Sequence, residues 1–220
     1  MYLKWLVREL DFTQKNRVAY QLRRQAMQKN GLKSIPTLDA LIKFLEDYEK
    51  QLTREIRREL KNYPIYTEWL SKVPGVGVLS AARLIAYIGD IKRFPTASKL
   101  RRYCGYAVIN GRAERGAVDG RRHYNGACKK TLYQLESSFI MHDTPYGQLY
   151  RRIKERVMEK NSDWPNWKKE RKARRIMIQL FLSHLYEVWS RLEGLEVRPP
   201  YPIEYLGHQG YITPYELLKE

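Results

Sequence analysis

The stretch that decides the fold is Trp69–Asp90, which reads WLSKVPGVGVLSAARLIAYIGD. Apolar residues at helical spacing lead into the turn VPGVG at 73–77, and a second helix rich in small residues follows directly. Gly75 and Gly77 allow backbone conformations that a Cβ would penalise, so the turn can present bare N–H groups. The N-terminus of the second helix adds unpaired donors and partial positive charge. The pattern predicts a helix-hairpin-helix that binds phosphate; the alternative is a helical hairpin without a ligand.

The charge of the chain favours the first interpretation. The 220 residues carry 41 Lys and Arg against 24 Asp and Glu, which gives a formal net charge of +17. Such an excess attracts polyanions, so nucleic acid is the expected partner. A membrane is the rival, but the sequence has no apolar run that would span a bilayer and no signal-peptide pattern at Met1. We therefore expect a cytoplasmic, nucleoid-associated protein with no membrane partner.

The two cysteines, Cys104 and Cys128, imply no disulfide framework. They could be drawn together with His123 and His142 as a zinc site, but the spacing matches no usual ligand pattern. The expectation is two small, half-buried cysteines and no metal or other cofactor in this chain.

The periodicity predicts a mainly α fold that opens with a long helical arm over residues 1–63. A first helix carries an apolar stripe at Leu3, Leu6, Leu10, Val18, Leu22 and Ala26, and ends near Asn30-Gly31. A second helix spans 38–60, with Thr37 as the predicted N-cap and apolar residues near heptad spacing. Such a seam is typical of a coiled-coil-like hairpin, and it pairs either with the first helix or with a second copy of the chain.

Residues 64–194 are predicted to form the helix-hairpin-helix and a further helical domain. Thr96 and Asn125 are expected to cap helices, Thr144-Pro145 to begin another, and a long helix to run from about Lys168 to Leu192. The face of that helix predicted to enter the core comprises Ile176, Leu180, Leu185, Val188 and Trp189. Between Tyr106 and Tyr124 helical periodicity gives way to glycines, which indicates an ordered loop or a short β-hairpin. Residues 195–220 read as a proline-rich, extended tail with a short terminal turn.

Two basic clusters join the hairpin as candidate nucleic-acid contacts, because tyrosines that can stack on bases are interleaved with the first of them. The alternative for each cluster is a solvated face that contacts no nucleic acid. The predicted DNA-binding residues are Lys72, Val73, Gly75, Val76, Gly77, Ser80 and Arg83 at the hairpin; Arg101, Arg102, Arg112, Arg115, Arg121, Arg122, Lys129 and Lys130 around the glycine-rich segment; and Lys168, Lys169, Arg171 and Lys172 at the last helix.

Catalytic residues are not evident in the sequence. Metal-dependent phosphodiester cleavage needs converging carboxylates, and Asp90, Glu114, Asp119, Glu136 and Asp143 form no recognisable constellation. Asp90 is expected to be a helix-end turn residue. A Tyr124 nucleophile beside Arg121 and Arg122 would rest on sequence adjacency alone, which is a poor argument for an active site.

The segment Trp69–Trp189 resembles the C-terminal domain of transposases of the insertion-sequence 110/116/902 group. The matching pieces, in order, are VPGVG at 73–77, AYIGDI at 86–91, RFPTA at 93–97, YCGY at 103–106, NG at 125–126 and TLYQ at 131–134. The arm before this segment is similar to the coiled-coil insertion that precedes the domain in such transposases. The resemblance implies the fold and a role in DNA transposition.

The resemblance also implies features that this sequence does not match. Family members begin with an RNase-H-like domain that supplies carboxylates for divalent metal, whereas Met1 here enters the arm directly. A serine of the C-terminal domain is thought to attack DNA, but the corresponding position here is Ala113 or a neighbour, and no serine occurs between Ser98 and Ser137. Fold and nucleic-acid binding therefore carry over, while cleavage does not, and enzymatic activity stays undecided.

Three functional hypotheses follow. The first is a transposase-family DNA-binding protein without a complete nuclease site, which acts with a separate catalytic subunit that supplies the divalent metal. The second is a non-enzymatic protein derived from a transposase that binds RNA or chromosomal DNA. The third is an active strand-transfer enzyme with an unrecognised nucleophile. The further partners considered are a structured guide RNA, which some family members use, and a second copy of the chain through the arm.

Overall fold

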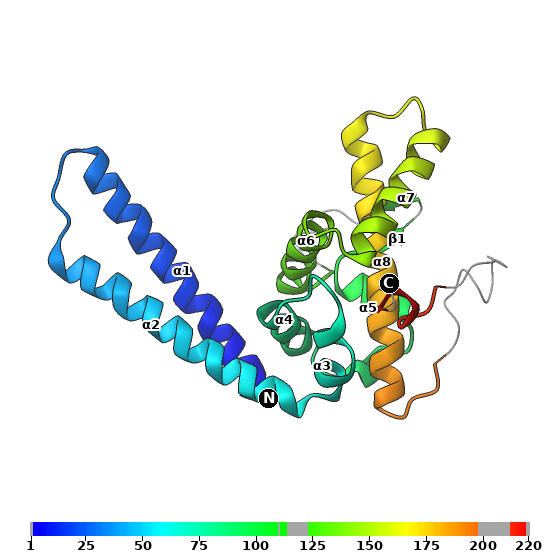
Figure 1. Ribbon diagram of the computed structural model, residues 1–220, viewed down its shortest axis with the longest axis horizontal. Helices are drawn as coiled ribbons and strands as arrows, with labels where there is room; N and C mark the ends of the chain where they lie inside the picture. Colours follow the sequence, from blue (N-terminus) through cyan, green and yellow to red (C-terminus); the bar gives the residue numbers. More distant parts are fainter. Residues whose placement is uncertain (1, 110, 114–122, 198–211, 219–220) are drawn as a thin grey trace. The chain divides into compact units, whose positions relative to one another are not determined.

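The computed structural model describes residues 2–109, 111–113, 123–197 and 212–218 (Figure 1). The fold is mainly α, as predicted, with eight α-helices and one two-stranded antiparallel sheet within these ranges. The chain divides into two compact units, Met1–Tyr63 and Pro64–Glu220. The assignment of residues 64–194 to a transposase domain and of 195–220 to a tail stays a prediction.

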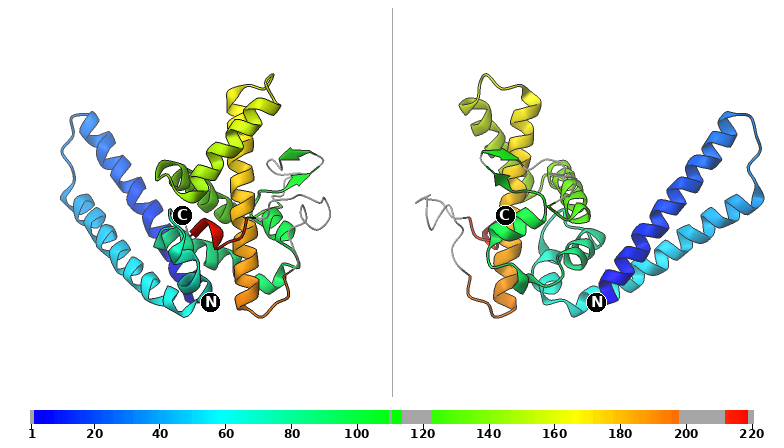
Figure 2. Two further views of the ribbon diagram at one scale, coloured as in Figure 1. Left: turned by 45° about the vertical axis from the view of Figure 1, so that its right-hand side comes forward. Right: turned by 180° about the vertical axis from the view of Figure 1, so that it is seen from behind.

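The first unit is a pair of antiparallel helices, α1 (Tyr2–Lys29) and α2 (Pro36–Glu59), followed by the 3-10 turn η1 (Leu60–Asn62) (Figure 2). Ion pairs link the helices: Arg17 Nε lies 2.6 Å from a carboxylate oxygen of Glu49, and Arg24 lies 3.3 Å from Asp39. α1 ends at Lys29, and Gly31 in the following turn has φ +70°. The helix end predicted near Asn30-Gly31 is thus confirmed.

Two details of the arm differ from the prediction. α2 begins at Pro36 with Ile35 as N-cap and no side-chain cap, because proline fits the first helical turn and places Thr37 inside the helix. The apolar stripe of α1 is buried only from Leu3 to Thr13, whereas Val18 is 46% and Leu22 59% exposed. The predicted apolar stripe is therefore buried only in the N-terminal half of α1, and polar and charged pairs join the helices in the half nearest the turn.

The second unit begins with short helical segments and ends with long helices. Its elements are α3 (Pro64–Glu68), η2 (Leu70–Lys72), α4 (Val78–Ile88), η3 (Ile91–Arg93), α5 (Ala97–Tyr103), β1 (Val108–Ile109), β2 (Arg112–Ala113), α6 (Gly126–Met141), α7 (Pro145–Lys160), α8 (Asn166–Leu192) and η4 (Glu216–Leu218). The strands pair in the register Val108 with Ala113 and Ile109 with Arg112. This hairpin is one of the two conformations predicted for the glycine-rich segment.

Side-chain caps fix where three of these helices begin. The caps at Thr96 and Asn125 were predicted, as was the start of a helix at Thr144-Pro145. Thr96 Oγ1 accepts a hydrogen bond from the Lys99 amide at 3.3 Å. Asn125 Oδ1 accepts from the amides of residues 127 and 128 at 2.9 and 3.0 Å, and Thr144 Oγ1 accepts from the Gly147 amide at 3.1 Å. Each cap satisfies a backbone donor that the first helical turn leaves unpaired.

The long helix α8 lies at the centre of the second unit, in contact with α3, α5, α6 and α7 (Figure 1). Every residue from Phe181 to Ser190 is buried, so this part of α8 is surrounded on all sides. The Phe181 ring lies 5.4 to 5.7 Å from those of Trp69, Phe139 and Tyr146. Of the predicted core face, Leu185, Val188 and Trp189 are buried, but Ile176 and Leu180 are only half-buried.

The C-terminal residues 212–218 lie against the same core. The Trp69 indole N–H donates to the Pro214 carbonyl at 3.3 Å, and Leu217 is buried. His184 Nε2 donates to the Ile212 carbonyl at 2.8 Å, and its Nδ1 therefore accepts from the Tyr146 hydroxyl at 2.7 Å. The terminal turn predicted from the sequence is confirmed as η4.

Candidate nucleic-acid interface

One side of the turn at 73–77 is anchored in the core. Val73 is 2% exposed, and Ser138 Oγ on α6 donates to the Gly75 carbonyl at 2.8 Å. Gly75 has φ +88°, and a Cβ there would lie only 2.8 Å from Cδ1 of Phe139. Glycine is thus required at this position by backbone conformation and by packing, independently of any ligand.

The other side of the turn is open. Gly77 is the N-cap of α4 with extended backbone (φ −77°, ψ 162°), and an added Cβ would meet no atom within 4 Å. The Ala81 amide donates to the Gly77 carbonyl at 3.0 Å, and no side chain of the described residues caps the helix. The first amides of α4 therefore have no side-chain cap on a side where an anion has room.

The other predicted residues of the hairpin lie before the turn, within it and on the first turns of α4. Lys72 is exposed, and its ammonium group lies 3.6 Å from Glu68 in an ion pair on the surface. Val76, Ser80 and Arg83 are half-buried. Within this short stretch, Lys72 and Gly77 are thus exposed next to the first turns of α4, while Val73 and Gly75 pack against the core.

Arg101, predicted to bind DNA, is held within the protein. Its Nε donates to the Gln179 carbonyl at 3.1 Å, and its Nη2 donates to Ser183 Oγ. Burial between α5 and α8 lowers the pKa of Arg101 to about 10, because desolvation penalises the charged form. Arg102, the next residue, is exposed. We therefore keep Arg102 and leave Arg101 out of the candidate surface.

The remaining residues of the first cluster are only partly described. Lys129 Nζ lies 4.2 Å from the centre of the Tyr124 ring, and Lys130 is exposed. Arg112 contributes its backbone to β2. Arg115, Arg121 and Arg122 lie outside the described residues.

A buried polar network underlies this cluster, and the sequence did not predict it. The Tyr106 hydroxyl donates to Glu136 at 2.5 Å, and Gln179 Nε2 donates to the Tyr106 carbonyl at 2.6 Å. Burial raises the pKa of Glu136, although the bond from Tyr106 opposes the shift. The Arg175 guanidinium lies 5.4 Å from the centre of the Tyr106 ring. The only sequence signal was spacing, since Arg175, Gln179 and Ser183 recur every four residues of α8.

The second predicted cluster combines lysines with tryptophans at the N-terminal end of α8. Lys168 and Lys172 place their ammonium groups 3.6 and 4.9 Å from the centre of the Trp164 ring. Arg171 lies 5.3 Å from that of Trp167. Lys169 differs from its neighbours: its side chain is buried, and its Nζ donates to the Ser162 carbonyl at 3.0 Å.

Three of the five candidate carboxylates lie in the described residues, and each of them has a structural partner. Asp90 accepts from the Lys92 amide at 2.9 Å at the start of η3, which confirms the predicted turn role, and Asp143 pairs with Arg151. Glu114 and Asp119 lie outside the described residues. Within the described ranges, no three His, Cys, Asp or Glu residues are placed to hold a metal ion. Cys104 and Cys128 are free and fully buried, so the prediction of half-buried cysteines was wrong: both pack inside the unit near the ends of α5 and α6.

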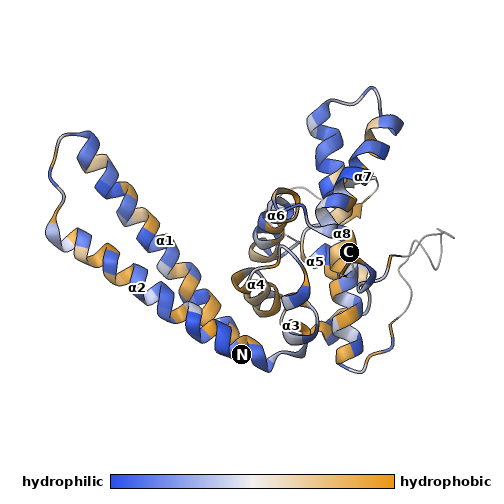
Figure 3. Ribbon diagram, viewed as in Figure 1, coloured by the Kyte–Doolittle hydropathy of each residue, from blue (hydrophilic) through white to orange (hydrophobic). Residues whose placement is uncertain are grey.

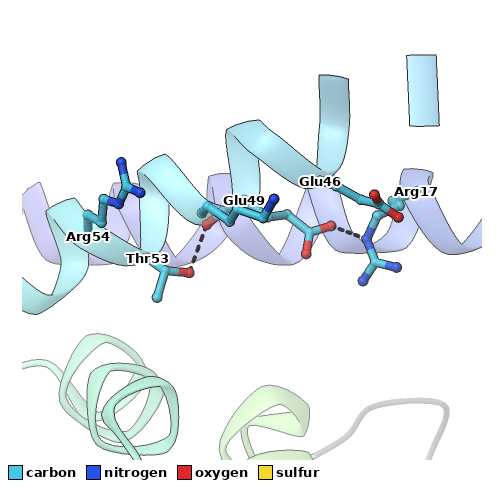
Figure 4. Close-up of a pocket in the computed structure, with 6 residues that line it drawn as sticks. Arg17, Glu46, Glu49, Thr53 and Arg54 are labelled. Carbon is cyan, nitrogen blue, oxygen red and sulfur yellow. Dashed lines mark hydrogen bonds and ion pairs between the residues drawn. The ribbon is translucent and has the colours of Figure 1, made fainter. Parts of the chain in front are cut away.

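The arm contains an open hollow of about 530 Å³ (Figure 4). Its lining residues are Arg17, Glu46, Glu49, Lys50, Thr53 and Arg54. Glu49 pairs with Arg17, and its carbonyl accepts from the Thr53 hydroxyl at 2.7 Å. The hollow is an open surface groove in which Arg17 and Thr53 both pair with Glu49, and we assign it no site.

No described helix is long and apolar enough to cross a membrane. The second unit is thus a helical protein unit with a buried core, an open glycine turn and exposed basic side chains.

Comparison with known proteins shows what one segment of the second unit is similar to. Residues 67–151 match the model of the transposase IS116/IS110/IS902 family. A segment of 73 residues is 34% identical to the insertion element IS110 uncharacterized 43.6 kDa protein of Streptomyces coelicolor (strain ATCC BAA-471 / A3(2) / M145). The segment covers 33% of this chain and 18% of that relative. Residues 67–151 are thus similar to the IS116/IS110/IS902 transposase family, as their motifs predict, and this similarity supports a role related to transposition.

Proposed function

We propose that this chain binds DNA during transposition through the open side of the 73–77 turn and the adjacent basic surface, and that it does not cleave DNA by itself. The observation that carries the proposal is the difference between the two glycines of the turn. Gly75 is required by packing, whereas Gly77 borders open space at the uncapped N-terminus of α4. A phosphate would accept hydrogen bonds from the first amides of α4, with Lys72 supplying positive charge nearby.

The charge of the whole chain supports the same conclusion. A formal charge of +17 draws the protein to DNA at long range, and local contacts then determine the geometry of the complex. Arg102, Lys130, Lys168 and Lys172 are exposed and suited to further phosphates. Each phosphate neutralised adds about one unit to the slope of log affinity against log salt concentration.

The substitution Gly77→Asp tests the proposed phosphate contact without threatening the fold. Aspartate is a favoured N-cap, so it occupies the first amides of α4 and places a carboxylate where the phosphate would lie. We expect an affinity loss of about tenfold or more for labelled duplex and four-way-junction DNA, measured by fluorescence anisotropy in a salt titration. Thermal unfolding should show a midpoint no lower than that of the unmodified protein.

The matched control is Gly77→Ala, which adds a Cβ in open space but neither charge nor cap. It should bind within about threefold of the unmodified protein, since it leaves the helix amides accessible. Equal affinity and equal salt slope for Gly77→Asp and Gly77→Ala would contradict the proposed site.

Two further results, one from a cleavage assay and one from binding titrations, bear on the function. Nicking or covalent attachment of DNA by this chain alone with Mg²⁺ would refute the separation of binding from cleavage. A strong preference for structured RNA over both DNA forms would replace the proposal with an RNA-binding role.

A further inference from the structure

The end of the α7–α8 hairpin is hydrophilic, and Lys and Arg strongly outnumber Asp and Glu from Arg151 to Arg175 (Figure 3). Two tryptophans, Trp164 and Trp167, lie within this basic stretch. Basic surfaces are common on proteins that bind duplex DNA, but large aromatic rings among the cations are not needed for contacts to phosphates alone.

The two rings are in different environments. Trp164 is half-buried, and the ammonium groups of Lys168 and Lys172 lie 3.6 and 4.9 Å from its ring centre. Its ring therefore holds two cations in place by cation–π attraction. Trp167 is 55% exposed, and the Arg171 guanidinium lies 5.3 Å from its ring centre.

An exposed tryptophan next to fixed cations is the arrangement by which proteins hold single-stranded nucleic acid. The ring stacks on a base, while the cations neutralise the phosphates on either side. In a duplex, neighbouring base pairs cover the faces of each base, so only the phosphate contacts are available. Removal of the Trp167 ring should therefore weaken the binding of single-stranded DNA more than the binding of duplex DNA.

We infer that Trp167 stacks on an unpaired DNA base, with Lys168, Arg171 and Lys172 contacting the flanking phosphates. This inference rests on the proposed DNA-binding function and adds a second subsite with a preference for unpaired strands. Such strands are present wherever DNA ends or junctions are opened during strand exchange.

The test compares a labelled 20-nucleotide oligothymidylate with a 20-base-pair duplex, using fluorescence anisotropy at matched ionic strength. Trp167→Leu keeps an apolar side chain but removes the aromatic face, and we expect it to weaken oligothymidylate binding about tenfold and duplex binding less than twofold. Trp167→Phe keeps an aromatic face and should stay within about threefold for both DNA forms.

A second readout is the intrinsic tryptophan fluorescence of the protein. Binding of oligothymidylate should quench the tryptophan fluorescence of the unmodified protein, and Trp167→Phe should remove most of that quenching. Thermal unfolding of both variants should match that of the unmodified protein, because the side chain is exposed.

Three outcomes would overturn the inference: equal oligothymidylate affinity for the unmodified protein and Trp167→Leu, equal losses on oligothymidylate and duplex, or a preference of the unmodified protein for oligouridylate RNA over oligothymidylate that Trp167→Leu abolishes. The first two leave the proposed function intact if Gly77→Asp still impairs duplex binding. If Gly77→Asp binds normally while Trp167→Leu fails on oligothymidylate, the stacking site stands and the hairpin proposal falls.

Discussion

The two ends of α8 belong to one continuous helix but have opposite surroundings. From Asn166 to Lys172 the helix carries exposed lysines and Trp167, whereas from Phe181 to Ser190 every residue is buried. The first part meets solvent at the end of the α7–α8 hairpin, and the second is enclosed by α3, α5, α6 and the C-terminal residues. A single helix can thus hold the core together at one end and carry the proposed DNA-binding residues at the other.

This difference predicts that substitutions in the two parts will separate stability from binding. Changes in the buried part should lower the free energy of unfolding, because they open cavities or leave polar groups unpaired. Substitutions of the exposed side chains in the first part should alter DNA affinity and its salt dependence while the fold stays intact.

The largest expected effect is that of Phe181→Ala. The ring is fully buried among Trp69, Phe139 and Tyr146, so its removal loses apolar burial and leaves a cavity that the neighbours fill only in part. We expect a loss of about 3–5 kcal/mol in the free energy of unfolding, measured by urea denaturation. The control, Leu192→Ala at the exposed end of the helix, should cost less than about 1 kcal/mol, and equal losses would contradict the comparison.

An intermediate effect on the free energy of unfolding is expected when the pH is lowered, because His184 lies in the buried part of α8. Burial lowers the pKa of His184 to about 4, although the bond to the Ile212 carbonyl opposes the shift. The folded protein therefore keeps His184 neutral between pH 6.5 and 4, while the unfolded chain takes up a proton there. Stability from this group is present above about pH 6.5 and is lost as the pH falls towards 4, with about 2 kcal/mol gone at pH 5.

Comparing urea denaturation at pH 7.5 and 5.0 for the unmodified protein and His184→Gln isolates this contribution. The variant lacks the titrating ring, so its loss between the two pH values should be smaller by about 2 kcal/mol. The comparison with a variant is needed because Glu136, whose pKa is raised, contributes in the opposite direction. An equal pH dependence in both proteins would show that His184 is not held neutral in the folded state.

The sequence predicted those elements whose signals are local. Thr96 and Asn125 cap helices as predicted, because capping requires only a side-chain oxygen next to backbone amides. The buried face of α8 was predicted only in part. A helix enclosed on all sides has no single apolar face for periodicity to reveal.

The candidate site was less predictable than the fold, because sequence does not determine where a long side chain points. Arg101 and Arg102 are adjacent, yet Arg101 donates to Gln179 and Ser183 inside the protein while Arg102 is exposed. Gly75 and Gly77 were predicted to share one role. The structure separates them because only Gly75 packs against Phe139.

The smallest expected effect on stability tests the exposed part of α8 with two lysines three residues apart. Lys172→Ala removes an exposed ammonium group beside Trp164 and should cost at most about 1 kcal/mol in unfolding free energy. It should lower DNA affinity and reduce the salt slope by about one unit, since one phosphate contact is lost. Lys169→Ala removes the buried bond to the Ser162 carbonyl, so it should cost about 1–3 kcal/mol and leave the salt slope unchanged. The reverse result, a smaller salt slope for Lys169→Ala than for Lys172→Ala, would show that Lys169 and not Lys172 contacts the phosphate. It would contradict the separation of binding from stability within α8.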